Sequence, residues 1–361
     1  MSRNRFTGIT SRFLMLIVAG VQAMTYLSVL VNPSKVWVMT IFGLLFIPVA
    51  LVNLFLLVWA VKRRSRAFLI PFLAILPSVF FVGKYVQSPF GHDSGDGMPD
   101  AGGQDAVRVV TYNVGRFSSA EGIDNPGKCM DSVALFLKSC DADVICLQEV
   151  HAGSVMELKE YLSGKFSGYK SEYYVNIGRK GCSGNVTLSR FPVRGKGVVS
   201  FEKSANMALY TDYRIRGEDI RIYNCHLESY ALSLPSIVKS IRNHDRSVFR
   251  KTEERVRTSI TRRPEQVDLI LEDVASSPLS AFVCGDFNDN PMSHTYFRLS
   301  RGRSDSFVEA GTGFGATYSL LWPMLRIDYI LFPRRFSAVW HKTFKIDYSD
   351  HYPVVSDVVI P

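Results

Sequence analysis

Hydrophobic positions divide the chain into two parts with different patterns. The first part holds three long uncharged runs, Phe13–Val31, Val36–Val61 and Ala67–Gly83, of 19, 26 and 17 residues. A membrane-spanning helix needs about 20 consecutive apolar residues, with a lower limit of about 17. The pattern therefore predicts two spanning helices. The third run contains Pro71 and Pro77, so it either spans the membrane with kinks or enters the membrane and returns.

The charges that flank these runs predict an orientation. Arg3, Arg5 and Arg12 precede the first run, whereas only Lys35 follows it. By the positive-inside rule the N-terminus lies in the cytoplasm. With three spans the chain after residue 86 lies outside the cytoplasm, and with two spans it lies inside. We expect an integral protein of the inner or plasma membrane with an extracytoplasmic globular part. A cleaved signal peptide is the alternative for the first run, but no small-residue cleavage site follows it.

The second part alternates short apolar runs, typical of strands, with amphipathic stretches, typical of helices. Strands and helices do not alternate strictly, which favours a mixed sheet or two packed sheets. Residues 87–105 are rich in Gly, Asp, Pro and Ser and predict a flexible linker between a membrane region, 1–86, and a globular domain, 106–361. The predicted strands are 107–112, 144–147, 170–176, 185–189, 195–201, 207–215, 219–225, 281–284, 327–332 and 353–359, and the predicted helices are 128–139, 155–162 and 264–274.

Charge is distributed unevenly along the chain. The net charge is +9, but residues 1–86 hold nine Lys/Arg and no acid, so the remainder is balanced. The pI of about 9.2 is therefore no evidence for a DNA-binding face. One stretch, 239–263, has nine basic residues against three acids. It is either a solvated helix or a basic arm that contacts lipid phosphates or a phosphorylated substrate.

All six cysteines lie in the globular domain. Cys146, Cys225 and Cys284 fall inside strand-like apolar runs, which is typical of buried free thiols. An even number in an extracytoplasmic domain also permits disulfides, whose pairing the sequence does not reveal.

Polar residues of the metal-ligand and acid–base types follow the predicted strands. Taken singly, each has an ordinary explanation as a turn residue or a surface histidine. Together they indicate a site, because ligands collect at strand ends in sheets that carry helices. The residues are Asn113, Glu149, His226, Asp286, Asn288, Asp328, Asp350 and His351.

Seven fragments resemble, in order, motifs of the endonuclease/exonuclease/phosphatase superfamily, the deoxyribonuclease I-like group. That group includes apurinic endonucleases, neutral sphingomyelinases and inositol-polyphosphate 5-phosphatases. The resemblance covers about 107–361 and does not extend to 1–105. The stretch 232–258 looks like an insertion, and the third fragment is a looser match than the others. The fragments are TYNV (111–114), LQEV (147–150), GNVTLSRFP (184–192), NCHLES (224–229), GDFND (285–289), RIDYIL (326–331) and SDHYPV (349–354).

The resemblance implies an α/β (α+β) fold, a four-layer sandwich of two packed mixed β-sheets flanked by helices, here preceded by an N-terminal transmembrane helical region. It also implies hydrolysis of a phosphate ester with Mg²⁺, or Mn²⁺ in its place. Glu149 would be the main metal ligand, with Asn113 and Asp350 nearby. Mg²⁺ takes oxygen ligands and keeps several waters, so one or two carboxylates suffice.

The same resemblance implies roles for the other polar residues. Asp286 would orient or deprotonate the attacking water, and Asn288 would hold Asp286 or the phosphate. His351, oriented by Asp328, would bind or protonate the phosphate group. His226 would donate a hydrogen bond to a phosphate oxygen. Tyr318 could line the site as well, although core packing is the favoured interpretation.

We expect a membrane-tethered Mg²⁺-dependent phosphodiesterase or phosphatase that acts on a lipid head group or on nucleic acid. Tethering favours lipid, and the balanced charge of residues 87–361 does not favour duplex DNA. One alternative is an extracytoplasmic endonuclease or exonuclease. Another is a non-catalytic, membrane-anchored binding module, which is disfavoured because every expected site position is filled. The sequence indicates no obligate protein partner.

Overall fold

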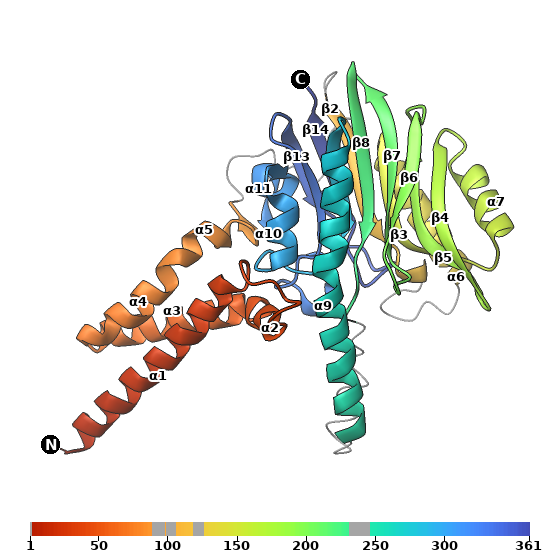
Figure 1. The fold of residues 1–361 in the computed structure, drawn as a ribbon. Helices are drawn as coiled ribbons and strands as arrows, with labels where there is room; N and C mark the ends of the chain where they lie inside the picture. Colours follow the sequence, from red (N-terminus) through yellow and green to blue (C-terminus); the bar gives the residue numbers. More distant parts are fainter. Residues whose placement is uncertain (1, 89–97, 99–105, 118–125, 231–245) are drawn as a thin grey trace. The chain divides into compact units, whose positions relative to one another are not determined.

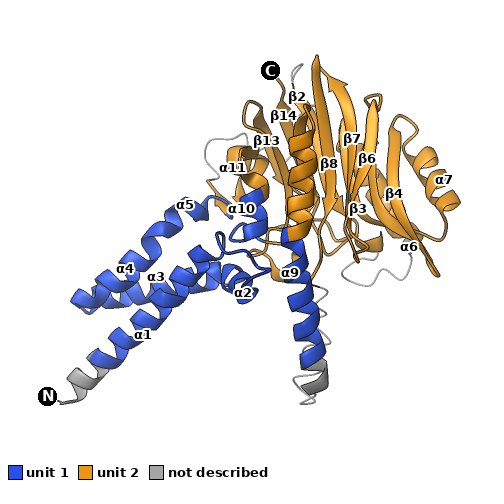
Figure 2. Ribbon diagram, in the orientation of Figure 1, with its two compact units in different colours: residues 1–85, 231–264, 290–298 blue, residues 86–230, 265–289, 299–361 orange. Residues whose placement is uncertain are grey.

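The computed structural model describes residues 2–88, 98, 106–117, 126–230 and 246–361 (Figure 1). Most of the predicted linker therefore lies outside the described residues, as does the start of the basic stretch, 239–245. The chain forms two compact units (Figure 2). The helical unit comprises residues 1–85, 231–264 and 290–298, and the sheet unit comprises residues 86–230, 265–289 and 299–361.

The helical unit begins with α1 (Ser2–Leu27), of which Ile9–Leu27 is long and apolar enough to cross a membrane. The second apolar run, expected as one helix, forms α2 (Val38–Leu44) and α3 (Phe46–Lys62), which are bent by 58° at their junction. The third run breaks into short pieces, and Pro77 lies within one of them. These pieces are η1 (Arg66–Phe68), α4 (Leu69–Ile75), η2 (Leu76–Ser78) and α5 (Val79–Val82).

The sheet unit contains two mixed six-stranded sheets. The first has the order β13-β14-β2-β3-β5-β4 and the second the order β10-β12-β9-β8-β7-β6. Each sheet has one parallel pair, β2 with β3 and β8 with β9. The strands of the first sheet are β2 (Ala106–Asn113), β3 (Val144–Ala152), β4 (Lys170–Gly178), β5 (Gly181–Ser189), β13 (Ser337–Thr343) and β14 (Val354–Val359). Those of the second are β6 (Gly195–Ser200), β7 (Met207–Ile215), β8 (Glu218–His226), β9 (Ser280–Asp286), β10 (Arg303–Asp305) and β12 (Asp328–Pro333).

The two sheets pack face to face across an apolar core. Successive side chains of a strand point to opposite faces of its sheet. In β2, Val109 therefore joins the core between the sheets with Ile222 and Ile330, whereas Val110 and Tyr112 face the helices outside. This alternation is typical of sheets that pack face to face at about 10 Å.

Helices cover the outer faces of both sheets (Figure 1). Apolar residues of α6 (Pro126–Ser139) and α7 (Val155–Lys165) join the outer core cluster of the first sheet. On the second sheet, Asp273 of α9 (Arg246–Ser276) accepts hydrogen bonds from Arg221 and Tyr223 of β8. The remaining elements are α10 (His294–Ser300), α11 (Ser306–Ala310), the 3-10 turns η3 (Gly115–Phe117) and η4 (Ser319–Leu321), and a short pair of strands, β1 (Val86–Gln87) and β11 (Gly313–Phe314).

The architecture confirms the predicted fold class, and every predicted strand and helix of the sheet unit is present. The main difference is α9, which begins at Arg246 rather than at Pro264. The polar surface of its first half hides the helical periodicity. The elements β10, β13, α10 and α11 were not predicted from the sequence. All six cysteines are buried free thiols. The structure therefore shows the free thiols that the sequence favoured and not the disulfides that it also permitted.

Candidate active site

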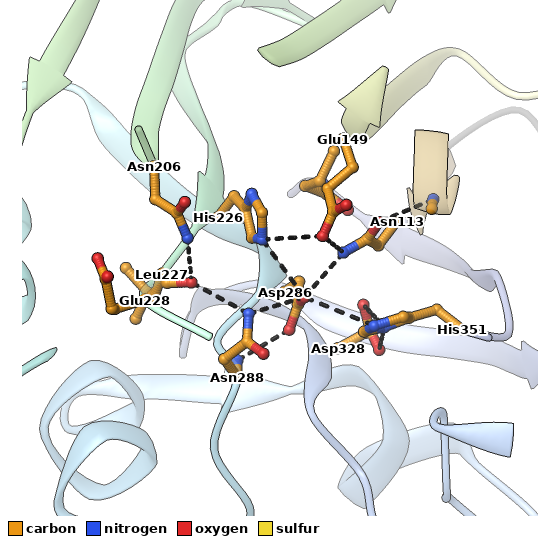
Figure 3. Close-up of polar contacts among 12 residues, drawn as sticks. Asn113, Glu149, Asn206, His226, Leu227, Glu228, Asp286, Asn288, Asp328 and His351 are labelled. Carbon is orange, nitrogen blue, oxygen red and sulfur yellow. Dashed lines mark hydrogen bonds and ion pairs between the residues drawn. The ribbon is translucent and has the colours of Figure 1, made fainter. Parts of the chain in front are cut away.

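Four polar side chains meet where the two parallel strand pairs end (Figure 3). In the first sheet, Asn113 is the last residue of β2, and Glu149 lies on the adjacent β3. In the second sheet, His226 and Asp286 end β8 and β9 and lie opposite each other in register. Parallel pairing places the two polar residues of each sheet at the same edge of that sheet. The face-to-face packing of the sheets then brings these two edges together.

Asp286 lies at the centre of this site and accepts hydrogen bonds from two neighbouring asparagines. Its side chain is 1% exposed. Oδ2 accepts hydrogen bonds from Asn113 Nδ2 at 2.9 Å and Asn288 Nδ2 at 3.0 Å, while Oδ1 accepts one from the Asn288 backbone N–H at 2.8 Å. Burial raises the pKa of Asp286 to about 6, and the charge of Asp328 adds to this rise against the opposing charges of His351 and His226. A carboxyl with such a pKa can accept a proton near neutral pH.

His351 forms a second pair with Asp328, the first residue of β12. Nδ1 of the imidazole is 3.0 Å from Asp328 Oδ2, and Nε2 is 3.8 Å from Asp286 Oδ2. Burial alone lowers the pKa of His351, but the carboxylates, Asp328 foremost, outweigh it and raise the pKa to about 10. The imidazole is therefore a cation at neutral pH, with one N–H held by Asp328. Thr317 Oγ1 fixes the start of β12, because it accepts hydrogen bonds from the backbone N–H groups of Ile327 and Asp328.

Glu149 lies at an irregularity in β3, where the pairing with β5 shifts register between Leu147 and Val150. Its φ is +53°, which is uncommon for a residue with a Cβ and is typical of bulges beside active sites. Oε1 accepts a hydrogen bond from Asn113 Nδ2 at 3.2 Å and lies 3.5 Å from His226 Nε2. Burial raises the pKa of Glu149, but the charge on His226 and the Asn113 hydrogen bond outweigh it and leave this pKa below its usual value.

His226 carries a buried ring nitrogen, Nε2, that makes no hydrogen bond to any of the described residues. This atom lies 3.5 Å from Glu149 Oε1 and 3.8 Å from Asp286 Oδ2. A buried polar atom without a partner costs free energy, on the order of 1–3 kcal/mol, unless a bound group satisfies it. Its position between two carboxylates indicates that it faces the place where a substrate or ion binds.

The turn after β9 depends on a glycine. Gly285 has φ +130°, and a Cβ there would lie 2.8 Å from the backbone nitrogen of Cys225 on the neighbouring strand and collide with its carbonyl oxygen. Only glycine therefore lets β8 and β9 approach so closely just before Asp286. Beyond it, Asn288 has φ +51° and donates from Nδ2 to the Leu227 carbonyl at 3.0 Å, which ties the turn to the end of β8.

A buried polar network lies beside these side chains and was missed by the sequence analysis. Gln148 Nε2 donates to Thr111 Oγ1 at 3.1 Å and to Asn224 Oδ1 at 2.8 Å. Asn224 Nδ2 donates to the Leu147 carbonyl at 3.1 Å, and Asn185 Nδ2 donates to the Asn224 carbonyl at 2.9 Å. The network links the two sheets through β2, β3, β5 and β8. Its sequence signal was a polar residue next to a site residue, as in Gln148–Glu149.

Three other residues lie at the margin of the site. Asp350 was expected beside Glu149, but its carboxylate accepts only from Ser349 Oγ, at 3.3 Å, among the described residues. Tyr318, expected in the core, instead lies half-buried and edge-on to His351, with 5.3 Å between ring centroids. Arg116 was not anticipated, and its Nε lies 3.7 Å from Glu149 Oε2.

Two sets of residues could hold a metal ion. The first set consists of Asp286, Asp328 and His351, each of which has one ligand atom within 4.8 Å of those of the other two. His351, however, is a cation bonded to Asp328, so it has no lone pair to offer, and this group is better described as charge-paired. The second set consists of Glu149 and Asn113. The Glu149 carboxylate stays ionised and its side chain is 29% exposed. Asn113 Oδ1 accepts a hydrogen bond from the Gly115 N–H at 3.0 Å and keeps a second lone pair for an ion. This set offers only oxygen atoms, which fits Mg²⁺.

Comparisons with known families match both parts of the chain. The family described as Endonuclease/Exonuclease/phosphatase family matches residues 110–351. A second family, described as a domain of unknown function (DUF8431), matches residues 8–85. No curated protein matches the sequence.

Solved structures similar to the chain share its fold. An endonuclease/exonuclease/phosphatase from Beutenbergia cavernae DSM 12333 has a TM-score of 0.53 at 19% identity, covering 71% of this chain and 72% of that one. One from Bacteroides vulgatus has a TM-score of 0.54 at 17% identity, covering 71% and 99%. The Bacteroides thetaiotaomicron VPI-5482 mannosyl-6-phosphatase Bt3783 has a TM-score of 0.50 at 18% identity, covering 70% and 100%.

Proposed function

Because the chain belongs to the endonuclease/exonuclease/phosphatase family, we propose that it is a membrane-tethered, metal-dependent hydrolase of phosphate esters. Members of this family are phosphoester hydrolases, among them nucleases and phosphatases. The observation that carries the proposal is the pairing around Asp286. A proton acceptor with a pKa of about 6 lies 3.8 Å from a protonated imidazole, His351, whose pKa is about 10. Two groups whose pKa values are pushed apart in one site are typical of acid–base catalysis.

Each side chain has a role in this reaction. Asp286, aligned by Asn113 and Asn288, takes a proton from the water whose oxygen attacks phosphorus. His351, held by Asp328, donates its Nε2 proton to the leaving oxygen or to the phosphate. The bond between phosphorus and the leaving oxygen breaks, and the products are a phosphate and an alcohol.

The family is generally divalent-metal dependent, and the oxygen donors described above support Mg²⁺, or Mn²⁺ in its place. Glu149, with Asn113, would hold the ion. When bound, it neutralises charge on the phosphate and stabilises the leaving oxygen. His226 Nε2 donates a hydrogen bond to a phosphate oxygen, which provides the hydrogen bond that this nitrogen does not make within the described part of the chain.

The helical unit supports a membrane location because its polarity is reversed relative to a soluble protein. Phe13, Phe55 and Phe80 are 65%, 67% and 79% exposed. Gln22 and Asn53, in contrast, are fully buried, and Asn53 Nδ2 donates to Gln22 Oε1 at 3.3 Å. Apolar side chains outside and interhelical hydrogen bonds inside are typical of helices packed in lipid. We place the catalytic unit outside the cytoplasm, which requires that the third apolar run, residues 67–83, completes a third span after the two that the charge distribution orients.

The proposed substrate is a lipid head group rather than nucleic acid. The loop between Tyr318 and Arg326 supports this, because Leu320, Trp322 and Met324 are exposed on it. The loop is joined to the catalytic segment, since the Ser319 N–H donates to the Asp350 carbonyl at 2.9 Å. An apolar loop beside a phosphate-binding site fits a substrate with an apolar part. A nuclease is the second candidate, supported by basic side chains of α9 that include the exposed Arg250.

The test uses the full chain purified in detergent, with Mg²⁺ and with EDTA. The substrates are bis-p-nitrophenyl phosphate, sphingomyelin in mixed micelles and plasmid DNA, and Asp286→Ala and His351→Ala serve as inactive comparisons. We expect Mg²⁺-dependent hydrolysis that both variants lose, with a preference for the lipid. Preferential cleavage of DNA would favour the nuclease. Absence of Mg²⁺ binding and of any hydrolysis would leave the binding module as the better description.

A further inference from the structure

The chain passes from the sheet unit into the helical unit immediately after the catalytic turn. Asp286 and Asn288 belong to the sheet unit, which includes residues up to Asp289, whereas residues 290–298 belong to the helical unit. The segment that continues from the two catalytic residues is therefore built into the N-terminal helices. We refer to residues 290–298 as the post-catalytic segment.

Within the helical unit, buried hydrogen bonds hold the post-catalytic segment. Asn290 Nδ2 donates to the Gly43 carbonyl of α2 at 3.0 Å, and Ser28 Oγ donates to the Met292 carbonyl at 2.7 Å. Asn290 also accepts at Oδ1 from the Met292 N–H at 3.1 Å. Both bonds to the N-terminal helices are buried, so their loss would leave unsatisfied polar groups.

Apolar packing reinforces this attachment. The Met292 side chain is fully buried in a cluster with Val29, Phe46 and Tyr85. Lys84 Nζ lies 5.0 Å from the ring centroid of Tyr296, a cation–π distance. The post-catalytic segment thus contacts parts of the N-terminal region that precede α2, that belong to α3 and that follow α5.

The closest approach occurs at Gly43. A Cβ at this position would collide with the Met292 carbonyl oxygen and lie 2.8 Å from Ser28 Oγ. Since one of these atoms is backbone, a larger residue must displace the post-catalytic segment. Gly20 of α1 is different, because a Cβ there would meet nothing within 4 Å.

We propose that the N-terminal helices position the catalytic turn through the post-catalytic segment, so that they are part of the catalytic scaffold as well as an anchor. The physical reason is the backbone of the turn. Asn288 has φ +51°, a conformation that persists only when the surrounding structure constrains it. On one side β9 provides that constraint. On the other side the Tyr329 hydroxyl donates to the Asp289 carbonyl at 2.9 Å, and Asn290, two residues on, is bound to Gly43. This inference rests on the proposed function for its activity test.

The test compares Gly43→Ala with Gly20→Ala in the full chain, in detergent or in vesicles. Both changes replace a helical glycine by alanine, which favours the helix, and only the first creates a clash. With bis-p-nitrophenyl phosphate and Mg²⁺, we expect Gly43→Ala to lower kcat by about 10- to 100-fold, because small misplacement of a catalytic group has effects of this size. The KM and the Mg²⁺ concentration for half-maximal rate stay within about twofold, since the binding groups are unchanged. Gly20→Ala behaves as the wild type.

A second readout does not depend on the substrate. The Asn288 N–H donates to Asp286 Oδ1, so its hydrogen exchange reports on the catalytic turn. We expect faster exchange at residues 286–289 in Gly43→Ala and no change in Gly20→Ala. If Gly43→Ala does not fold, two variants that add no bulk take its place. Ser28→Ala removes the hydrogen bond to the Met292 carbonyl, and Asn290→Ala removes the bonds to the Gly43 carbonyl and from the Met292 N–H.

The outcomes separate the inference from the proposed function. Equal kcat and equal exchange in wild type, Gly43→Ala and Asn290→Ala would overturn the inference while leaving the hydrolase intact. If the wild type hydrolyses no ester, the proposed function fails, and hydrogen exchange alone decides the inference. A fall in kcat together with faster exchange in Gly43→Ala supports it.

Discussion

His351 Nδ1 lies 3.0 Å from Asp328 Oδ2 at the start of β12, and this pair keeps the imidazole charged although it is buried. Asp328 also lies opposite Asp286 in the sheet register. The cation therefore lies between two carboxylates, Asp328, which pairs with Nδ1, and Asp286, which lies 3.8 Å from Nε2. This arrangement allows one histidine to serve as an acid at neutral pH.

Replacing Asp328 by Asn tests this pair. The amide keeps the shape but removes the charge that most raises the pKa of His351. We expect kcat to fall by about 10²- to 10⁴-fold, the range for loss of general acid catalysis. The alkaline limb of the pH–rate profile should move to lower pH. The control is Asp347→Asn, an exposed aspartate on the segment that carries His351. An unchanged alkaline limb in Asp328→Asn would contradict the assignment.

The wild-type profile of kcat/KM against pH should be bell-shaped. Asp286 must be ionised to accept a proton, and its pKa is about 6, so the rate rises as pH increases through about 6. His351 must be protonated to donate, and its pKa is about 10, so the rate falls as pH increases through about 10. Measurement from pH 4.5 to 11 at saturating Mg²⁺ tests both limbs. A flat profile between pH 4.5 and 7 would exclude Asp286 as the base.

Removal of the Glu149 charge should weaken the metal requirement specifically. We expect Glu149→Gln to raise the Mg²⁺ concentration for half-maximal rate by at least about tenfold, since one charged oxygen ligand becomes neutral. Mg²⁺ should raise the melting temperature of the wild type, because a ligand that binds only the folded state stabilises it. The variant should lose most of this rise. Glu160→Gln, on the exposed surface of α7, is the control. Equal Mg²⁺ dependence in all three proteins would argue against Glu149 as a ligand.

A methyl group at Gly285 should disrupt the junction between the two catalytic strands. The added Cβ collides with Cys225 on β8, so Gly285→Ala should destabilise the protein by about 3 kcal/mol or more and abolish hydrolysis. The control is Gly217→Ala, which also has a positive φ of +88° but has open space around its Cβ. That variant should lose only about 1 kcal/mol through backbone strain and retain activity. Thermal unfolding with activity assays distinguishes the two.

His341 should make the protein sensitive to acid. Burial is the main cause that lowers its pKa to about 3, and Nδ1 is paired with Ser306 Oγ at 2.8 Å. In the unfolded chain histidine titrates near about 6.5. Between these two pH values the unfolded chain binds a proton at this histidine and the folded protein does not. The free energy of unfolding is therefore retained above about pH 6.5. It decreases by about 1.4 kcal/mol per pH unit as the pH falls toward about 3.

The comparison is with His341→Gln, which keeps a hydrogen-bonding group toward Ser306 and does not titrate. Melting temperatures at pH 7.5, 6.0 and 4.5 should converge as pH falls, because the wild type loses stability faster than the variant. Parallel curves would show that His341 contributes nothing to the acid response.

The sequence by itself determined most of the local elements and indicated the candidate site residues. Alternating apolar positions reveal which face of a strand is buried, so the strands of the two six-stranded sheets were predicted except β10 and β13, and β3 and β5 are longer than predicted. The motif residues Asn113, Glu149, His226, Asp286 and Asp328 all follow or begin such strands. Patterns of this kind depend on neighbours within a few residues, which is why they can be read without a structure.

Only the tertiary structure decided which of these residues act together. Asn113 and Asp286 are separated by 173 positions, and their hydrogen bond exists because two sheets pack with a particular offset. The bond between Asn290 and Gly43 spans 247 positions and assigns a segment of the predicted globular domain to the N-terminal helices. Contacts over such separations depend on how faces of similar hydrophobicity fit together. Local periodicity carries no information about that fit, because many packings bury the same apolar face.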